Sequence, residues 1–147
     1  MLLVKTIVKE SSIAGVGLFA DEPIKKGQCV WEFNPETCLV LTKKQIMLWL
    51  DSSKKNEIDI IHYYYLKHGY YEEKRDAVIF CLDNSRFINS ISQPNVHSDH
   101  DISVALRDIE KGEEITENYD VYGSSDWYKN LNPVLLKKGY SRKEIIL

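Results

Sequence analysis

Short apolar runs dominate the first half of the chain and predict β-strands. Leu3 to Val8 and Thr37 to Leu41 are apolar runs, and Gln28 to Phe33 alternates loosely between apolar and polar positions. Two later runs, Ala77 to Leu82 and Ile102 to Arg107, are typical of buried strands. The pattern therefore predicts a β-rich core.

A helix is expected to begin just after the first group of strands. The stretch Thr42-Lys43-Lys44-Gln45 is a capping box, with Thr42 as the N-cap and Gln45 at the third helical position. The next side chains supply a broad apolar face, made of Ile46, Leu48, Trp49 and Leu50. The sequence thus predicts a helix inserted in the middle of the chain.

Two further segments carry helix signals. The range 58–66 is open between helix and strand, because its apolar positions have helical spacing while three consecutive tyrosines favour a strand. Near the C-terminus, Asn132-Pro133 resembles the start of a helix and Gly139 resembles its end. A terminal helix is therefore expected after the β-rich part.

Length and composition indicate one ordinary domain. The chain has 147 residues, of which 44% are apolar and 28% are charged. A formal net charge of −3 argues against an obligate nucleic-acid binder. The longest apolar run is far shorter than a membrane span of about 20 residues, and no signal-peptide pattern opens the chain. A single-domain enzyme and a small binding module both fit these numbers.

The cysteines and histidines do not form a recognisable metal site. Cys29, Cys38 and Cys81 are widely spaced and include no CxxC pair, so a disulfide scaffold is not expected and a reducing, intracellular compartment fits better. His97 and His100 lie in a polar stretch that is interpreted as a solvated turn rather than a metal site. No metal is therefore expected.

One short pattern occurs twice in the chain. Ile24 to Val30 and Ile109 to Ile115 each contain a charged turn, a glycine, a polar residue and then a strand-like residue. The pattern predicts that Gly27 or Gly112 takes a positive φ before a strand begins. The two copies are either similar hairpins or a coincidence.

Three segments carry residues suited to a binding or catalytic site. Ala14 to Ala20 contains two glycines that let backbone approach a ligand closely, although they equally suit a turn before a strand. Arg86 to Asn95 combines asparagines with apolar anchors, or is a loop held by Asx-turns. Gly112 to Tyr122 offers Tyr119 and Tyr122 as pocket aromatics or as half-buried strand residues.

The order and spacing of these segments resemble the SET family of protein-lysine methyltransferases. The first segment is similar to the family stretch G-x-G-[VL]-F-A, and Ile24 to Phe33 is similar to its continuation I-x-x-G-E-x-V-x-E-[YF]. Arg86 to Asn95 is similar to R-[FY]-[IM]-N-H-S-x-x-P-N, and Gly112 to Tyr119 is similar to G-E-E-L-T-x-[DN]-Y. The resemblance spans about Val4 to Tyr122, and four motifs in order make it specific.

This resemblance implies a mainly β fold with added helices. Small curved β-sheets would surround a knot-like crossing, in which the segment with the C-terminal tyrosine passes beneath the loop formed by the asparagine motif. Residues 1–123 would form the SET domain, with a helical insert at about 42–66. Residues 124–147 would form a helical tail that closes the site.

The resemblance also implies a protein-lysine N-methyltransferase that takes its methyl group from S-adenosylmethionine (AdoMet). Tyr119 matches the catalytic tyrosine, whose hydroxyl lies beside the transferring methyl. Asn89 would hydrogen-bond the amino-acid end of the cofactor, and the main chain of Ser90 would approach the adenine. The implied cofactor-binding residues are Ala14, Gly15, Val16, Gly17, Leu18, Arg86, Phe87, Asn89, Ser90 and Trp127.

The sequence departs from the family pattern at Ser90. The family has a histidine there that helps to brace the crossing, and a serine is expected to be too short to reach the same partners. The alternative function is therefore a catalytically weakened SET-like domain that binds AdoMet or a protein.

The C-terminal part departs from the pattern as well. No cysteine follows Cys81, so the zinc-bound closure of some members is not expected. Trp127 would instead stack on the adenine and Tyr128 would line the site, unless both only anchor a terminal helix. Tyr122 lies three residues after Tyr119 instead of two, so its place in the lysine channel is open.

The implied partner is a protein that offers a lysine. The acidic balance suits a basic target such as a histone-like or ribosomal protein, and neither direct nucleic-acid binding nor membrane binding is expected. The number of methyl groups added is open.

Overall fold

The computed structural model describes residues 1–52, 68–99 and 101–121. These residues form two compact units, and the chain leaves the first unit and later returns to it. The first unit contains Met1–Leu39 and Cys81–Val121. The second unit contains, among the described residues, the ranges 40–52 and 68–80.

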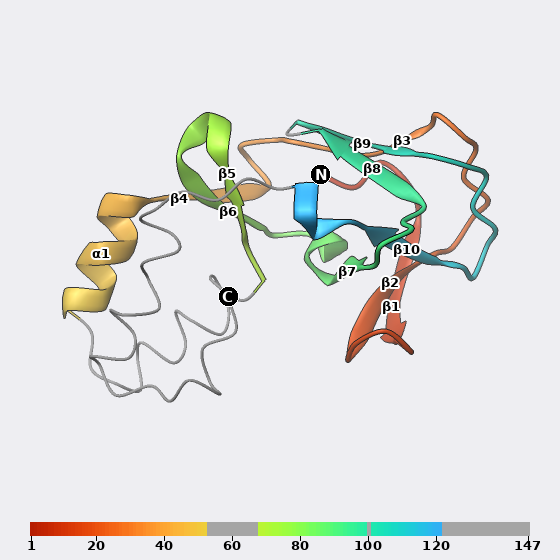
Figure 1. Cartoon of the computed structure of the whole chain (residues 1–147), viewed down its shortest axis with the longest axis horizontal. Helices are drawn as coiled ribbons and strands as arrows, with labels where there is room; N and C mark the ends of the chain where they lie inside the picture. Colours follow the sequence, from red (N-terminus) through yellow and green to blue (C-terminus); the bar gives the residue numbers. More distant parts are fainter. Residues whose placement is uncertain (53–67, 100, 122–147) are drawn as a thin grey trace. The chain divides into compact units, whose positions relative to one another are not determined.

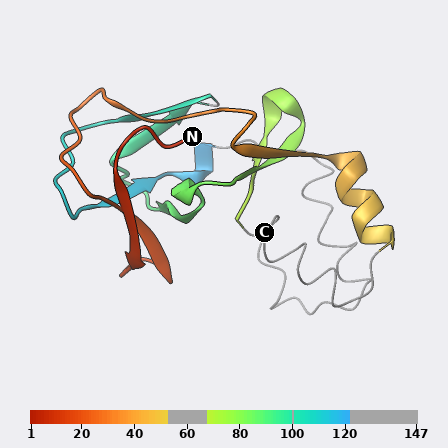
Figure 2. The ribbon, with the colours of Figure 1, turned by 180° about the vertical axis from the view of Figure 1, so that it is seen from behind.

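A four-stranded sheet of the first unit joins distant parts of the sequence. Its strands are β1 (Thr6–Glu10), β2 (Val16–Ala20), β10 (Glu114–Glu117) and β7 (Asn89–Ser90), in the order β1-β2-β10-β7. The hairpin of β1 and β2 is antiparallel, β10 joins it antiparallel, and β7 pairs with β10 in parallel. Figure 1 and, from behind, Figure 2 show these strands together. The sheet therefore places the glycine, asparagine and tyrosine segments side by side.

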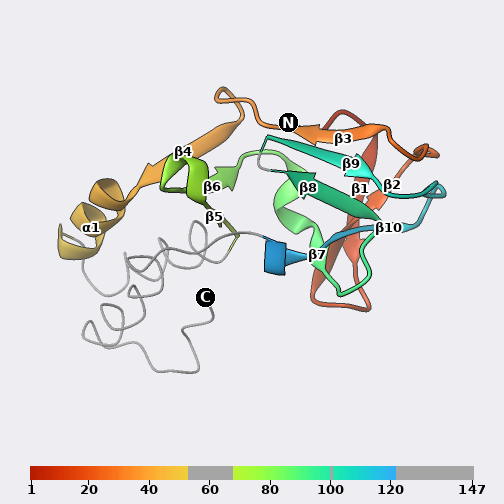
Figure 3. The ribbon, with the colours of Figure 1, turned by 45° about the horizontal axis from the view of Figure 1, so that its top comes forward.

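A second, three-stranded sheet completes the first unit. It contains β3 (Cys29–Glu32), β9 (Ile102–Ala105) and β8 (Val96–Asp99) in antiparallel pairs, which Figure 3 shows as neighbours. Both sheets contribute aliphatic side chains to one core, as expected when each sheet buries one face. The core residues are Val4, Leu18, Ala20, Ile24, Val30, Ile88, Val96, Ala105, Ile109 and Ile115.

The two copies of the repeated pattern pair with each other. Ile24 and Ile109 exchange backbone hydrogen bonds of 2.9 Å in both directions. Gly27 has φ +80° and Gly112 has φ +88°, which confirms the predicted positive φ at both turns. In each turn the residue after the glycine, Gln28 or Glu113, accepts a hydrogen bond from the backbone nitrogen three residues earlier. The copies are therefore two turns of the same construction.

The second unit contains helix α1 and most residues of a three-stranded sheet, of which only the ends Cys38, Leu39 and Cys81 belong to the first unit. The strands β4 (Cys38–Thr42), β6 (Ala77–Cys81) and β5 (Tyr70–Glu72) lie in the order β4-β6-β5. Helix α1 (Lys43–Ser52) follows β4 directly. The capping box is confirmed, because Gln45 N donates to Thr42 Oγ1 at 3.4 Å and Thr42 N donates to Gln45 Oε1 at 2.9 Å. A 3₁₀ turn, η2 (Glu73–Arg75), connects β5 to β6.

Several boundaries differ from the sequence prediction for non-local reasons. Strand β1 begins at Thr6 and not at Leu3, because Leu3 N donates to Val30 O and the N-terminal residues follow β3 instead. Strand β9 ends at Ala105 and not at Arg107. Leu106 N still donates to Asn95 O in the register of β8 and β9, but Asn95 N donates to Thr116 Oγ1 and so does not return the bond. Leu48 is 56% exposed, so it does not belong to the buried face of α1, whereas Ile46 is fully buried.

Other expectations fall beyond the part of the chain that the structure describes. These are the element at 58–66, the terminal helix and the tail at 124–147. Within the described ranges, no helix is both long enough and apolar enough to span a membrane.

Candidate functional site

The amide of Asn89 lies where the glycine segment meets β10. Its Nδ2 donor is surrounded by four acceptors: Ser11 Oγ at 3.1 Å, Ala14 O at 3.2 Å, Val16 O at 3.1 Å and Glu114 Oε1 at 2.8 Å. Because acceptors alone surround the nitrogen, the orientation of the amide is fixed by its neighbours. Its Oδ1 is left as an acceptor that no other described residue uses.

The two glycines of the first segment have different roles. Gly15 has φ +49° and its carbonyl accepts from Ser11 N, so it makes the hairpin turn between β1 and β2. Gly17 provides space, because a Cβ there would lie 2.1 Å from Glu114 Oε1 and 3.1 Å from Asn89 Nδ2. A glycine is thus needed at Gly17 to admit the carboxylate of Glu114.

Glu114 is held in that space by a second polar contact. Ser11 Oγ lies 2.8 and 2.9 Å from the two carboxylate oxygens of Glu114. Together with Asn89, these side chains form a polar cluster whose acceptors are a carboxylate and the carbonyls of Ala14 and Val16. We call Ser11, Asn89 and Glu114 the amide cluster.

The remaining residues of the first segment divide between surface and core. Ala14, Gly15 and Val16 are exposed, so their backbone is accessible to a ligand. The side chain of Leu18 is fully buried in the core, and only its main chain is available to a site.

Arg86 and Phe87 position the asparagine segment from one side. They end the 3₁₀ turn η3 (Asn84–Phe87), which Asp83 caps by accepting from Ser85 N at 2.9 Å. The guanidinium of Arg86 donates to Leu82 O and Asp83 O, and its Cζ lies 4.7 Å from the centroid of the Phe87 ring. Arg86 therefore stabilises the turn that precedes and positions Asn89.

Tyr119 is held at two points by the segment 88–90. Its backbone nitrogen donates to Ser90 Oγ at 3.0 Å, and its hydroxyl donates to the carbonyl oxygen of Ile88. Tyr119 begins the 3₁₀ turn η4 (Tyr119–Val121) directly after β10. Ser90 was expected to be too short to reach the partners of the family histidine. Its hydroxyl accepts a hydrogen bond from the main-chain nitrogen of Tyr119.

The ionisation of Tyr119 is shifted toward the neutral phenol. Burial of the hydroxyl end, followed by the negative charge of Glu117, raises the pKa of Tyr119 to about 12. Part of the residue remains accessible, since Tyr119 as a whole is 49% exposed. At neutral pH the side chain is therefore a protonated hydroxyl that can donate and accept hydrogen bonds.

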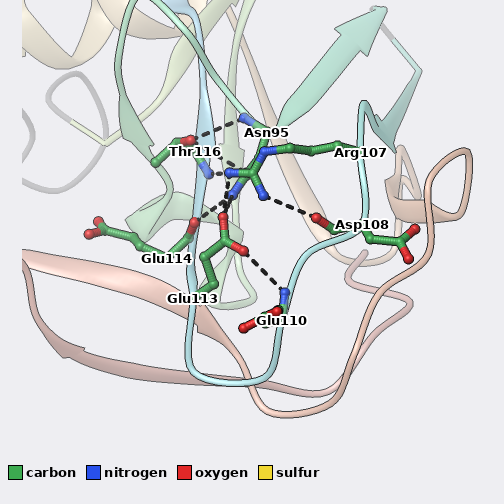
Figure 4. Close-up of polar contacts among 7 residues, drawn as sticks. All are labelled: Asn95, Arg107, Asp108, Glu110, Glu113, Glu114 and Thr116. Atoms are coloured by element: carbon green, nitrogen blue, oxygen red, sulfur yellow. Dashed lines mark hydrogen bonds and ion pairs between the residues drawn. The ribbon is translucent and has the colours of Figure 1, made fainter.

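A buried asparagine ties the second motif to the third. Asn95 is 2% exposed, its Oδ1 accepts from Thr116 N at 2.9 Å, and its Nδ2 donates to Glu114 O at 2.8 Å. The same amide donates to Glu113, which also binds Arg107 (Figure 4). The Arg107 guanidinium lowers the pKa of Glu113. This network fixes the loop after β7 against β10.

A second acidic side chain lies near Tyr119 and was not identified from sequence. Glu117 is 6% exposed, and its Oε1 accepts from Ser98 Oγ at 2.6 Å and Ser103 Oγ at 3.2 Å. Ser98 and Ser103 are directly opposite each other on β8 and β9. The position before Asn118-Tyr119 is variable in the motif, so no sequence signal marked this residue.

The structure brings together most of the residues expected at the site. Asn89 contacts the backbone of Ala14 and Val16, and Ser90 contacts Tyr119. Ser11 and Glu114 were not assigned a role from sequence, because they are 103 positions apart and only the fold makes them neighbours. Trp127, Tyr122 and Tyr128 lie outside the described residues.

Comparison with known proteins identifies the same region. The family model described as SET domain matches residues 15–120. The Variant-silencing SET domain-containing protein of Plasmodium falciparum is 33% identical over 127 residues, which cover 76% of this chain. The chain spans only 5% of the length of that relative.

Solved structures share the fold at low sequence identity. The Neurospora SET domain protein DIM-5, a histone lysine methyltransferase, is 19% identical with a TM-score of 0.55, covering 85% of this chain and 55% of that chain. The Polycomb Repressive Complex 2 of Chaetomium thermophilum, in an autoinhibited conformation bound to S-adenosylmethionine, is 19% identical with a TM-score of 0.56. That match covers 88% of this chain and 17% of the other.

Proposed function

The chain belongs to the SET domain family of lysine methyltransferases, and we propose that it transfers a methyl group from AdoMet to a lysine of a protein substrate. The observation that carries this proposal is the meeting of three segments around β7 and β10. The amide of Asn89 holds the backbone of the glycine segment, and its chain neighbours Ile88 and Ser90 both accept hydrogen bonds from Tyr119.

The acceptors in and beside the amide cluster suit the α-ammonium group of the proposed cofactor. Asn89 Oδ1, the carbonyls of Ala14 and Val16 and the carboxylate of Glu114 are all acceptors, and an α-ammonium group offers only donors. Ser90 presents main-chain groups next to Asn89 for the adenine. We also propose that Trp127 stacks on the adenine and that Arg86 and Phe87 act through the turn that places Asn89.

The chemistry that AdoMet supplies is a methyl group on a positively charged sulfur, so the protein needs little acid–base machinery. The protein's part is alignment of the lysine nitrogen with the methyl carbon, and exclusion of water from the lysine. A lysine must lose its proton before it can react, and an apolar aromatic surrounding lowers its pKa. Tyr119 would line this channel, together with Tyr122 and Tyr128.

Tyr119 is suited to orienting groups near the reacting atoms. Its hydroxyl stays protonated at neutral pH and donates to Ile88 O, which directs the oxygen lone pairs away from that carbonyl. Such lone pairs attract a methyl group that carries partial positive charge. Tyr119 thus acts by position and polarity instead of by proton transfer.

The alternative of a cofactor-binding domain without catalysis depends on Ser90. The hydrogen bond from Tyr119 N to Ser90 Oγ supports retained positioning of Tyr119 and therefore favours catalysis. Measuring AdoMet binding and methyl transfer on the same protein distinguishes the two functions, because both require binding and only the methyltransferase transfers the methyl group.

Two observations support a proposed class of substrate. DIM-5 is described as a histone lysine methyltransferase, and a protein of net charge −3 is suited to a basic partner. We propose an intracellular basic protein, such as a histone or a ribosomal protein, as the substrate.

The test is incubation of the purified chain with labelled AdoMet and separate histone and ribosomal protein fractions. We expect label on lysines of one fraction, and loss of most label with Tyr119→Phe, while calorimetry shows that the variant still binds AdoMet. Absence of AdoMet binding would remove both functions. Binding without transfer to any lysine would establish the binding module.

A further inference from the structure

Two buried cysteines lie next to each other, and neither belongs to the residues assigned to the proposed methyl transfer. Cys38 begins β4 and Cys81 ends β6, which are neighbouring strands. Their Sγ atoms are 4.0 Å apart, and each residue is 6% exposed. The backbone pairing continues beside them, since Leu82 N donates to Thr37 O at 2.9 Å.

The pair occupies a particular place in the chain. The chain leaves the first unit after Leu39 and returns to it at Cys81, so one thiol lies beside each of the two connections. A bond between the sulfurs would close a loop that contains the whole intervening segment. Closing a loop of that length removes conformational freedom mainly from the unfolded chain.

The geometry permits such a bond with small movements. A disulfide needs an S–S distance of about 2.05 Å, so the sulfurs must approach by about 2 Å, which rotation about the two Cα–Cβ bonds can provide. Directly neighbouring strands already hold the two backbones in place, and no strand has to separate.

The two thiols are also chemically unequal. The Cys81 thiol is positioned to donate to a Cys38 thiolate, which lowers the pKa of Cys38, whereas that same contact and burial raise the pKa of Cys81. A thiolate is the nucleophilic form of cysteine, so Cys38 is the sulfur expected to react first. Cys29 differs, because it is half-buried and its Sγ contacts the carbonyl of Trp31.

We propose that Cys38 and Cys81 form a dithiol that hydrogen peroxide oxidises to an intramolecular disulfide. In the first step the Cys38 thiolate attacks one peroxide oxygen, an S–O bond forms, the O–O bond breaks, and the departing hydroxide becomes water on protonation. In the second step the Cys81 sulfur attacks the Cys38 sulfenic acid, the S–S bond forms and the S–O bond breaks. The departing hydroxide takes the Cys81 proton, so two thiols and one peroxide yield one disulfide and two waters.

The experiment uses the purified full chain, treated with hydrogen peroxide and then alkylated with N-ethylmaleimide under denaturing conditions. The reduced protein should take up three maleimides, and the oxidised protein should take up one, at Cys29. Peptide mapping should show Cys38 linked to Cys81, and dithiothreitol should restore three reactive thiols. A small thiol treated in parallel reports that the peroxide is active.

Matched variants decide which sulfurs take part. Cys29→Ser should still form the disulfide, whereas Cys38→Ser and Cys81→Ser should not. Oxidised wild type should melt several degrees above reduced wild type, about 5 °C or more. If either serine variant fails to fold, mapping of the wild-type and Cys29→Ser proteins decides the matter alone.

Three outcomes overturn the proposal. These are a disulfide that includes Cys29, a disulfide between two molecules, or three reactive thiols after a treatment that oxidises the small thiol. None of these readouts depends on AdoMet or on methyl transfer, so the result is independent of the proposed function.

Discussion

The side-chain hydroxyl of Ser90 contributes to holding Tyr119 in the candidate site. The serine replaces an expected histidine, yet its Oγ accepts the backbone N–H of Tyr119 at 3.0 Å. This contact joins the strand that carries Asn89 to the turn that carries Tyr119. We therefore propose that Ser90 is a positioning residue that acts through Tyr119.

Ser90→Ala tests that role because alanine keeps the main chain and removes only the hydroxyl. A lost hydrogen bond of about 0.5–1.5 kcal/mol should lower kcat by about 2- to 10-fold. The AdoMet dissociation constant should change little, because the main chain next to Asn89 is retained. Steady-state methylation kinetics and calorimetry measure the two quantities.

Ser90→Thr is the matched control, since it restores a hydroxyl at the same position. Its kcat should stay near that of the wild type. A kcat for Ser90→Ala equal to that of Ser90→Thr would show that the hydrogen bond does not position Tyr119 for transfer.

The raised pKa of Tyr119 predicts a titration at alkaline pH. In the folded protein this phenol should ionise near pH 12, and Glu117→Gln should lower the value only in part, because burial is the larger cause. The unfolded tyrosine ionises near pH 10, so the associated stability is fully present below about pH 10 and is lost as the pH rises through the folded pKa. Phenolate absorbance of the wild type minus that of Tyr119→Phe isolates this group.

The direction of the Glu117→Gln effect is the decisive part of that measurement. An unchanged or higher Tyr119 pKa in this variant would show that the Glu117 charge does not act on the phenol. The Tyr119→Phe protein should also lose less stability between about pH 10 and pH 12 than the wild type.

At the scale of elements, the packing of β2 against β10 depends on the absence of a side chain at Gly17. A Cβ at this position would lie 2.1 Å from Glu114 Oε1 and 2.7 Å from Glu114 Cδ. The carboxylate cannot simply move away, because Ser11 and Asn89 both hold it. The β1–β2 hairpin, β10 and β7 therefore all meet at the Glu114 carboxylate, which fits only because Gly17 has no side chain.

Gly17→Ala should destabilise the protein by about 1–3 kcal/mol through overpacking. Glu114→Ala removes the atoms that the new methyl group would meet, so the double variant should lose less stability than the two single changes add up to. Urea unfolding of the four proteins gives the coupling, which is expected at about 0.5–3 kcal/mol for contacting residues. Strict additivity would mean that the alanine is accommodated elsewhere.

Local signals made the elements predictable, and non-local pairing set their limits. The capping box at Thr42 and the positive φ at Gly27 and Gly112 depend on neighbours within one turn, and all were anticipated. Strand β1 was placed too early, because the pairing of Leu3 with Val30 cannot be seen in a local window.

For the candidate site, too, the sequence predicted what a local motif marks and missed what depends on distant partners. Asn89 and Tyr119 were identified because each belongs to a motif that a resemblance made recognisable. Glu117 and Ser11 were missed because their partners come from other strands, and a lone acid or serine carries no signal of its own. Register and sheet order, which decide these contacts, are properties of the folded chain.

At the scale of the whole molecule, the described site residues all belong to one of the two packing units. The ranges that contain the amide cluster, Ser90 and Tyr119 lie in the first unit, and helix α1 lies in the second. Hydrogen bonds made by a bound ligand suppress local opening only where they are formed. AdoMet should therefore protect the two units unequally.

Hydrogen exchange with and without saturating AdoMet measures this difference. We expect slower exchange in the ranges 11–20, 86–95 and 114–119, and no local change in α1 (Lys43–Ser52). Asn89→Ala should lose the added protection in all three ranges together, because its amide joins the hairpin to β10. Equal slowing in α1 would contradict local protection and show that AdoMet acts by suppressing global unfolding, which reaches every amide by mass action.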